Sequence, residues 1–377
     1  MSKILIVGQF FASMENGKVF FPGGTERYIF GLAKQLQNDG YEVMILTVIT
    51  NKDEAGISIL DGLKIYRFKI SDKRYGYCAD FLSFINTLKF IRRFNPNIVH
   101  AISTRYRFAA GAITAAKIMK VKTVYTRTNL PNRKDRKQMW VLIDDFIFTK
   151  IIKQSDIIIS LSKEMKDILE QEIHRKSIDL IPSFIMRSYF RKIEKDDKRI
   201  LFVGRLDKLK GIEFLIESLS YVKNEIPEVK LSIAGNGDFL PHLKKLVFMY
   251  GLGDKITFEG HLGEDAIADM YSKSEIFVFP SLMEGMPMVL LEAMSSGLPV
   301  IAFDIGPCVE ALDGGKYGVL VKKGDIKDLS QKIIEILKNK EKRAYYSKMA
   351  MERSKEYTQE TVVRKIENVY SCLVKSL

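Results

Sequence analysis

The chain has 377 residues, of which 46 % are hydrophobic and 28 % charged, and this balance excludes an intrinsically disordered protein. Its length exceeds that of one ordinary hydrophobic core, so we expect two domains. No apolar run approaches the roughly 20 residues of a membrane-spanning helix, and the first residues lack a signal-peptide cleavage site. The 3 cysteines show neither metal-ligand nor disulfide spacing, which favours a reducing, cytoplasmic location.

The net charge of +13 is concentrated in the first half of the chain. Residues 1–190 hold 30 Lys and Arg against 18 Asp and Glu, whereas the remainder holds 29 against 28. A basic surface of this kind attracts an anionic membrane, nucleic acid or a phosphorylated substrate. The alternative interpretation is a lysine-rich surface that is merely solvated.

Short β-branched runs alternate with amphipathic stretches in the first half, a pattern typical of a parallel sheet covered by helices. The predicted strands are residues 3–8, 42–47, 97–102, 122–126 and 155–160. The predicted helices are residues 25–38, 79–94 and 106–119. We also expect a hairpin of residues 57–60 and 63–68, because Asp61-Gly62 between apolar runs favours a tight turn.

The same alternation begins again after a polar stretch. The predicted strands of the second half are residues 199–204, 229–234, 255–259, 275–280, 299–302 and 318–321. The predicted helices are residues 212–222, 239–249, 266–272, 288–295 and 326–337, with a further helical period in 359–376.

The sequence therefore predicts an α/β protein with two Rossmann-like domains. The first spans residues 1–186 and the second 199–358, with a linker at 187–198 and a closing helix that packs back on an existing domain. Open parallel sheets bind ligands at the carboxyl ends of their strands. A ligand shared by both domains would lie in the cleft between them.

The string from Pro280 to Met294 is the densest candidate for chemistry. It follows an apolar strand and leads through Pro287 into an amphipathic helix. The first amides of such a helix donate to a phosphate, and Glu284 in the preceding loop would hold sugar hydroxyls beside it. The alternative is that Glu284 caps the helix and Glu292 is an ordinary surface residue.

A second string, from Val203 to Ile212, joins a strand to a helix through a basic loop. Arg205 offers a planar fork and Lys210 a point charge, both suited to diphosphate oxygens. The alternative is a solvated charged loop. Glycines at other strand ends, Gly23-Gly24, Gly235 and Gly260, allow close approach of the backbone to a ligand.

These strings, in this order and spacing, resemble the family 4 glycosyltransferases. The resemblance is carried by Gly-Gly-x-Glu-Arg at 23–27, Gly-Arg-Leu-x-x-x-Lys-Gly at 204–211 and Glu-x7-Glu at 284–292. It implies the GT-B fold, in which two Rossmann-like domains face each other across a cleft and a final helix, here 359–377, returns to the first domain. It also implies an enzyme that retains the anomeric configuration and needs no metal or other cofactor.

The resemblance assigns roles to the motif residues. Arg205 and Lys210 would hold the donor diphosphate, Glu284 would contact the transferred sugar, and these three would be catalytic. Glu292 would bind the ribose hydroxyls. The other donor-binding residues would be Gly23, Gly24, Gly204, Gly235, Gly260, His261, Leu262, Gly285, Met286, Pro287, Met288 and Val289.

One loop departs from the family pattern. Relatives often carry a histidine in a Thr-x-His-Gly string after the strand that we expect at 122–126. This chain has Arg127, Thr128 and Asn129 there, so either Thr128 or Arg127 would occupy the place beside the sugar. None of the 4 histidines lies in that loop, and we expect each to be structural or on the surface rather than catalytic.

The basic excess is dense just before Trp140, at Arg133, Lys134, Arg136 and Lys137. This stretch favours reversible docking on an anionic membrane, although a solvated helix face explains it equally well.

We therefore expect a retaining, metal-independent transferase that moves a sugar from a UDP-sugar to a glycan or lipid-linked acceptor, in synthesis of envelope polysaccharide or glycolipid. We expect no nucleic-acid partner. The alternatives are a GT-B nucleotide-sugar epimerase and a non-catalytic protein that binds polyanions or membranes.

Overall fold

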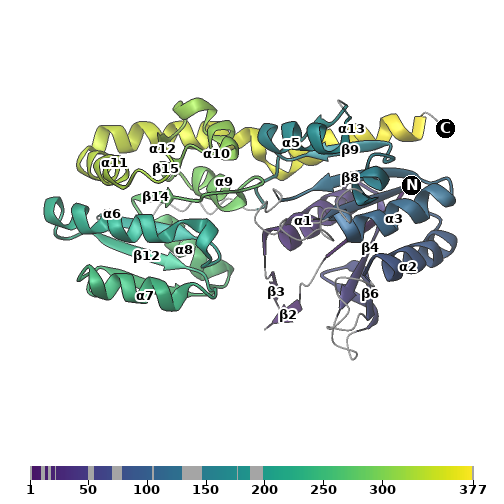
Figure 1. Cartoon of the computed structure of the whole chain (residues 1–377), viewed down its shortest axis with the longest axis horizontal. Coiled ribbons are helices and arrows are strands. Elements are labelled where there is room, and N and C mark those ends of the chain that lie inside the picture. Colours follow the sequence, from purple (N-terminus) through teal and green to yellow (C-terminus); the bar gives the residue numbers. More distant parts are fainter. Residues whose placement is uncertain are drawn as a thin grey trace. The chain divides into compact units, whose positions relative to one another are not determined.

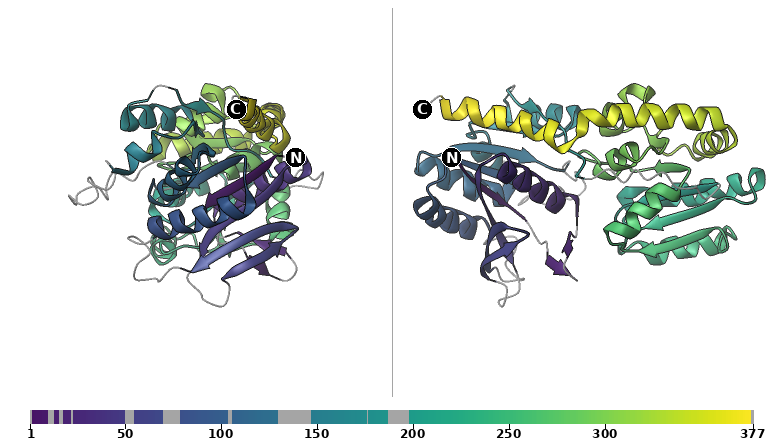
Figure 2. Two further views of the ribbon diagram at one scale, coloured as in Figure 1. Left: turned by 90° about the vertical axis from the view of Figure 1, so that its right-hand side faces the viewer. Right: turned by 180° about the vertical axis from the view of Figure 1, so that it is seen from behind.

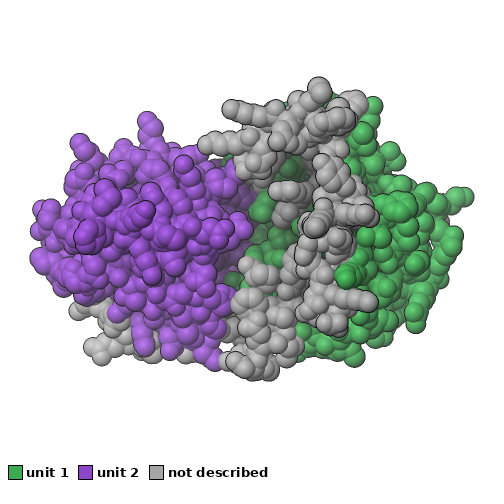
Figure 3. All heavy atoms as spheres, turned by 60° about the horizontal axis from the view of Figure 1, so that its bottom comes forward, with its two compact units in different colours: residues 1–183, 359–377 green, residues 184–358 purple. Residues whose placement is uncertain are grey.

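The computed structural model describes residues 2–9, 13–15, 18–21, 23–49, 55–69, 79–103, 106–129, 147–175, 177–186 and 198–375. The chain divides into two compact units, shown in different colours in Figure 3. Unit 1 contains Met1–Ser183 and Gln359–Leu377, and unit 2 contains Phe184–Thr358. The basic stretch at 133–137 with Trp140, and all but Lys198 of the expected linker, lie outside the described residues.

Unit 1 is built on an eight-stranded sheet of order β10-β9-β8-β7-β1-β4-β6-β5. The strands are β1 (Lys3–Gly8), β4 (Glu42–Ile49), β5 (Gly56–Leu60), β6 (Leu63–Lys69), β7 (Ile98–Ser103), β8 (Lys122–Arg127), β9 (Ile157–Ser160) and β10 (Asp179–Leu180). All neighbours run parallel except β5 and β6, which form the predicted hairpin. Its turn residues Asp61 and Gly62 have φ values of 47° and 78°, as a primed turn requires. A short hairpin of β2 (Ser13–Glu15) and β3 (Lys18–Phe20) was not predicted.

Helices cover both faces of this sheet (Figure 1). They are α1 (Gly24–Asn38), α2 (Ala79–Phe94), α3 (Tyr106–Ile118), α5 (Lys163–Ile173) and α13 (Gln359–Lys375). Apolar residues of α2, α3 and α5 form one core with alternate residues of β1, β4, β7 and β8, such as Leu5 and Tyr125. The intervening strand residues face α1 and α13, because residues of a strand alternate between the two faces.

The final helix α13 packs against α1 within unit 1 (Figure 2). Its Tyr370 hydroxyl lies 2.6 Å from Nδ1 of His100, and Nε2 of the same ring lies 2.8 Å from the Thr126 hydroxyl. The Gln359 side-chain amide also donates to the carbonyl of Gly31 at 2.7 Å. His100 is fully buried, so it is a core residue that ties α13 to the sheet.

Unit 2 is built on a six-stranded, wholly parallel sheet of order β13-β12-β11-β14-β15-β16. The strands are β11 (Arg199–Val203), β12 (Lys230–Ala234), β13 (Ile256–Gly260), β14 (Ile276–Phe279), β15 (Val300–Phe303) and β16 (Val319–Val321). The helices are α6 (Ile212–Glu225), α7 (Leu240–Met249), α8 (Glu264–Lys273), α9 (Met288–Ser295), α10 (Gly306–Ala311), α11 (Ile326–Lys338) and α12 (Lys340–Ser354). This is the doubly wound Rossmann order, and it reverses direction between β11 and β14.

The residues around the expected domain boundary at 186 group with unit 2. Ile185 forms a parallel bridge with Thr358, and its amide donates to the carbonyl of Tyr357 at 2.8 Å. Lys198, the last residue of the expected linker, donates through Nζ to the carbonyl of Leu337 at 2.9 Å.

Within the described ranges, no helix combines the length and the apolar character needed to cross a membrane.

Candidate functional site

The loops that follow β11 and β14 meet at the point where the strand order of unit 2 reverses, which is the ligand-binding position of doubly wound sheets. Lys210 Nζ lies 2.6 Å from Oε1 of Glu284, and the two side chains are 19 % and 10 % exposed. The Leu282 amide donates to the carbonyl of Leu209 at 2.8 Å, so the backbones are also joined. The fold thus brings together the two residues that the sequence placed in separate motifs.

The loop after β11 is shaped by Asp207. One of its oxygens accepts from the Leu209 amide at 2.9 Å and caps a single 3-10 turn, Lys208–Lys210. The other accepts from Arg205 Nε at 2.7 Å, while the Arg205 side chain stays 71 % exposed. Arg205 is therefore oriented by Asp207 yet open to a ligand.

Gly211, between that turn and α6, has a conformation and surroundings that only glycine tolerates. Its φ is +61°, and a Cβ would lie 2.1 Å from the carbonyl oxygen of Pro280. The absence of a side chain here lets the loop after β11 pack directly on the end of β14. The second string's final glycine is thus required by the contact between the two loops.

The helix that follows Glu284 begins with amides that have no acceptor within the helix itself. Pro287 is its N-cap, one position ahead of the first helical turn, and its carbonyl accepts from the amides of Leu290 and Leu291 at 3.1 and 3.3 Å. The amides of Met288 and Val289 precede these bonds, and the helix dipole adds positive potential beside them. This end of α9 can stabilise an anion next to Lys210 and Glu284.

Glu292 lies more than one turn inside α9 and is only 1 % exposed. The hydroxyl of Tyr271, from α8, lies 3.5 Å from its Oε2 and donates to the Val289 carbonyl at 3.2 Å. Tyr271 is fully buried. The sequence did not point to this tyrosine, because its partner comes from a different helix.

The ends of β11, β12 and β13 lie close together. The Gly235 amide donates to the Gly260 carbonyl at 2.7 Å, and a Cβ on Gly235 would lie 1.9 Å from the Gly204 carbonyl oxygen. Beyond them, His261 is exposed and Leu262 is half-buried. A hollow of about 440 Å³ opens beside these strand ends, lined by Arg205, Asp207, Lys208, Leu209, Gly237 and Asp238.

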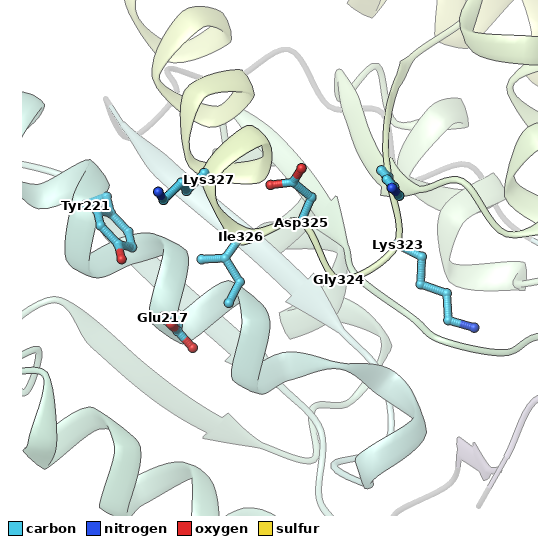
Figure 4. Close-up of a pocket in the computed structure, with 8 residues that line it drawn as sticks. Glu217, Tyr221, Lys323, Gly324, Asp325, Ile326 and Lys327 are labelled. Atoms are coloured by element: carbon cyan, nitrogen blue, oxygen red, sulfur yellow. The ribbon is translucent and has the colours of Figure 1, made fainter.

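A second hollow of about 410 Å³ lies elsewhere in unit 2, between α6 and the start of α11 (Figure 4). It is lined by Glu217, Tyr221 and the run from Lys322 to Lys327. None of the residues predicted for the site lines it.

In unit 1, the residues predicted for the site lie at the start of α1 and at the end of β8 with the loop that follows it. Gly23 is the N-cap of α1 and Gly24 its first residue, and the following Thr25 hydroxyl lies 3.2 Å from that of Thr128. The start of α1, just after Gly23, therefore meets the loop after β8. The contact is made by Thr128, which is 7 % exposed.

Arg127 has a different environment from its neighbour Thr128. It is the last residue of β8, and its guanidinium pairs with Glu172 of α5 at 3.0 Å and donates to the Asn129 carbonyl at 3.0 Å. Its side chain is 4 % exposed. The half-buried partner Glu172 was not predicted, because it lies 45 residues further along the chain.

Among the residues that the structure describes, no group of His, Cys, Asp and Glu has the arrangement of a metal site.

Comparisons with known proteins agree with this geometry. Residues 22–187 match the family model "Glycosyltransferase Family 4", and residues 187–353 match "Glycosyl transferases group 1". The chain is 29 % identical over 304 residues to the gpi3 subunit of the Schizosaccharomyces pombe phosphatidylinositol N-acetylglucosaminyltransferase. That match covers 77 % of this chain but 65 % of the relative, less than two thirds of its length.

Two solved structures share the fold. Sucrose-phosphate synthase from Thermosynechococcus elongatus gives a TM-score of 0.81 at 18 % identity, covering 100 % of both chains. Anabaena HepE in complex with UDP-glucose gives 0.79 at 17 % identity, covering 99 % of this chain and 100 % of that one. The GT-B fold expected from the sequence is thereby confirmed. With the two family models together spanning residues 22–353, the chain belongs to the family 4 glycosyltransferases.

Proposed function

We propose that this chain transfers a sugar from a nucleotide diphosphate donor to a hydroxyl group of an acceptor, and that unit 2 binds the donor. The observation that carries the proposal is the Lys210–Glu284 pair at the switch point of the sheet, beside the first amides of α9. Structural neighbours bind such ligands, since HepE was solved with UDP-glucose. A UDP-sugar is therefore the donor that we propose.

The chemistry follows from where charge develops. As the bond between the sugar and the diphosphate breaks, negative charge grows on the diphosphate, and preorganised cations and amides stabilise it. Arg205, Lys210 and the amides of Met288 and Val289 supply these groups. Glu284 accepts from a hydroxyl of the transferred sugar, and Glu292 from the ribose.

Retention of configuration and independence of metal are part of the same proposal. Lys210 and Arg205 offer fixed positive charge where a metal ion would otherwise neutralise the diphosphate. Turnover should therefore persist in excess chelator, and the product should keep the anomeric configuration of the donor. Activity that chelator abolishes and manganese restores would contradict the proposal, and so would an inverted product.

The acceptor that we propose is a glycan or a lipid-linked glycan reached at an anionic membrane surface. The name of the Schizosaccharomyces pombe relative gives it a phosphatidylinositol acceptor, which supports a lipid for this chain. Changing Arg133, Lys134, Arg136 and Lys137 to Glu should weaken binding to anionic liposomes at low salt. Changing the exposed Lys244 and Lys245 of α7 to Glu removes similar charge elsewhere and should have little effect.

The experiment that tests the function is a donor screen. Purified protein is incubated with UDP-, GDP- and ADP-sugars, with and without candidate acceptors, and the released nucleotide and sugar products are measured. We expect nucleotide release from a UDP-sugar and sugar transfer to an acceptor. Interconversion of the sugar without transfer would instead indicate an epimerase.

A further inference from the structure

We propose that Ser281 is a positioning residue that fixes the Glu284 carboxylate so that a single oxygen remains for the sugar. The orientation of the Glu284 carboxylate by Ser281 is inferred from contacts in the structure, whereas the effect of Ser281 on turnover rests on the proposed function. Ser281 follows β14 and is fully buried. It lies three residues before Glu284, in the loop that leads to α9.

The Ser281 hydroxyl has two acceptors within reach and one proton to give. Its Oγ lies 2.7 Å from Glu284 Oε1 and 3.1 Å from the carbonyl oxygen of Leu209. That carbonyl already accepts from the Leu282 amide at 2.8 Å. Because hydrogen bonds to a carboxylate are shorter and stronger than those to a neutral carbonyl, the hydroxyl donates to Glu284.

Both donors to Glu284 act on the same oxygen. Oε1 receives the Ser281 hydroxyl and the Lys210 ammonium at 2.6 Å, from opposite loops. Among the described residues, no group donates to Oε2 of Glu284. This oxygen is also not one of the fully buried side-chain atoms that lack a hydrogen-bond partner, so it is not sealed from solvent. Oε2 is thus the accessible acceptor, and its direction is set once two donors hold Oε1.

With Lys210 as its only donor, the Glu284 carboxylate could still rotate, so the direction of Oε2 would not be fixed. An ammonium group is a compact charge that a carboxylate can approach with either oxygen, whereas the buried hydroxyl is held by a short side chain just after β14. Removing the hydroxyl should therefore let the carboxylate rotate. The sugar would still bind through the nucleotide, but the productive orientation would be populated less often.

The kinetic test uses three variants and UDP-glucose as the probe. Ser281→Ala removes the hydroxyl and Ser281→Thr keeps it. Ser218→Ala is the matched control, because Ser218 is also fully buried in unit 2 and its hydroxyl donates to a carbonyl, that of Leu215, at 2.8 Å. We measure kcat and KM for release of UDP, the Kd of UDP alone, and the thermal midpoint of each variant.

We expect Ser281→Ala to lower kcat about 10- to 150-fold, the size typical of one hydrogen bond to a charged group. Its Kd for UDP should stay within about twofold of the wild type, because the bond does not involve the nucleotide. Ser281→Thr should restore most of kcat, and Ser218→Ala should change neither quantity. A loss no larger than that of Ser218→Ala, or no rescue by threonine, overturns the proposal.

A second measurement separates this proposal from the proposed function. A crystal structure of the unliganded wild type should show a single Glu284 side-chain conformer. The crystal structure of unliganded Ser281→Ala should show several. One unchanged conformer in the variant would overturn the positioning role. If the wild type neither binds UDP nor releases it from UDP-glucose, the proposed donor fails, while the crystal comparison still decides the role of Ser281.

Discussion

The strand ends of the two units carry opposite kinds of chemistry. In unit 2, Lys210 and Glu284 form a partly exposed charged pair. In unit 1, the described contact between the start of α1 and the loop after β8 is made by two uncharged groups, the Thr25 and Thr128 hydroxyls, which lie 3.2 Å apart. Arg127, the last residue of β8, is paired with Glu172 rather than open to a ligand. In our proposal, unit 2 therefore supplies the charge for a diphosphate, and Thr25 and Thr128 of unit 1 supply uncharged contacts.

The largest effect is expected from Lys210→Ala. This change removes a cation from the diphosphate site and leaves the Glu284 carboxylate without its ion-pair partner, a loss of about 2–5 kcal/mol for a desolvated pair. We expect kcat/KM for the donor to fall at least about 100-fold. Lys230→Ala is a suitable control, because Lys230 is an exposed lysine of the same unit whose Nζ donates to the backbone carbonyl of Asp254. Equal activity in both variants would place the diphosphate elsewhere.

The two carboxylates of the Glu-x7-Glu string should separate turnover from binding. Glu284→Ala should mainly lower kcat, because this loop carboxylate, which is 10 % exposed, faces the sugar in our proposal. Glu292→Ala should mainly weaken donor binding, since it removes the ribose contact. Steady-state kinetics with nucleotide titrations measure both. Effects under about threefold on both quantities, for both variants, would remove these residues from the donor site.

Arg127 and Thr128 give the sharpest contrast within unit 1. Arg127→Ala leaves Glu172 largely buried without its partner, and we expect unfolding free energy to fall by about 3 kcal/mol. Thr128→Ala should leave stability almost unchanged and alter donor use instead. The control is Arg127→Ala combined with Glu172→Ala, which should recover part of the lost stability. Crippled donor binding in an otherwise stable Arg127→Ala protein would show that this guanidinium serves the diphosphate.

The last prediction concerns pH and His100, whose effect is absent at neutral pH and grows only in acid. Burial lowers the pKa of this imidazole from 6.5 to about 3. Below about pH 6.5 the unfolded chain binds a proton that the folded chain refuses, so stability falls as the pH drops towards 3. The contribution approaches about 1.4 kcal/mol per pH unit. Denaturant unfolding of wild type and His100→Gln across pH 4–8 should show a shallower acid slope in the variant, and parallel slopes would contradict this account.

Most of unit 2 could be predicted from its sequence because its strands are buried runs between clear helical periods. The prediction of α9 as residues 288–295 agrees with the structure, and the other strands and helices that we predicted there differ by a few residues at their ends. The helix α12 (Lys340–Ser354) was missed, because charged residues occupy nearly all of its faces and only Ala350 and Ser354 are buried.

In unit 1, α5 was missed although its signals are present. Ser162 caps it, and Met165, Leu169 and Ile173 repeat at helical spacing. The motifs located the loops of the candidate site, but not the contacts between them. The Lys210–Glu284 pair spans 74 residues, and the hydroxyls of Ser281 and Tyr271 matter only because folding brings their partners to them.

The most direct test of the central claim is calorimetric titration of UDP, GDP and ADP into the wild type, Arg205→Ala and Lys210→Ala, all in excess chelator. The account predicts that UDP binds the wild type without metal, and that each variant binds it at least about tenfold more weakly. If no nucleotide binds, or if both variants bind as tightly as the wild type, then the charged loops of unit 2 are not the diphosphate site.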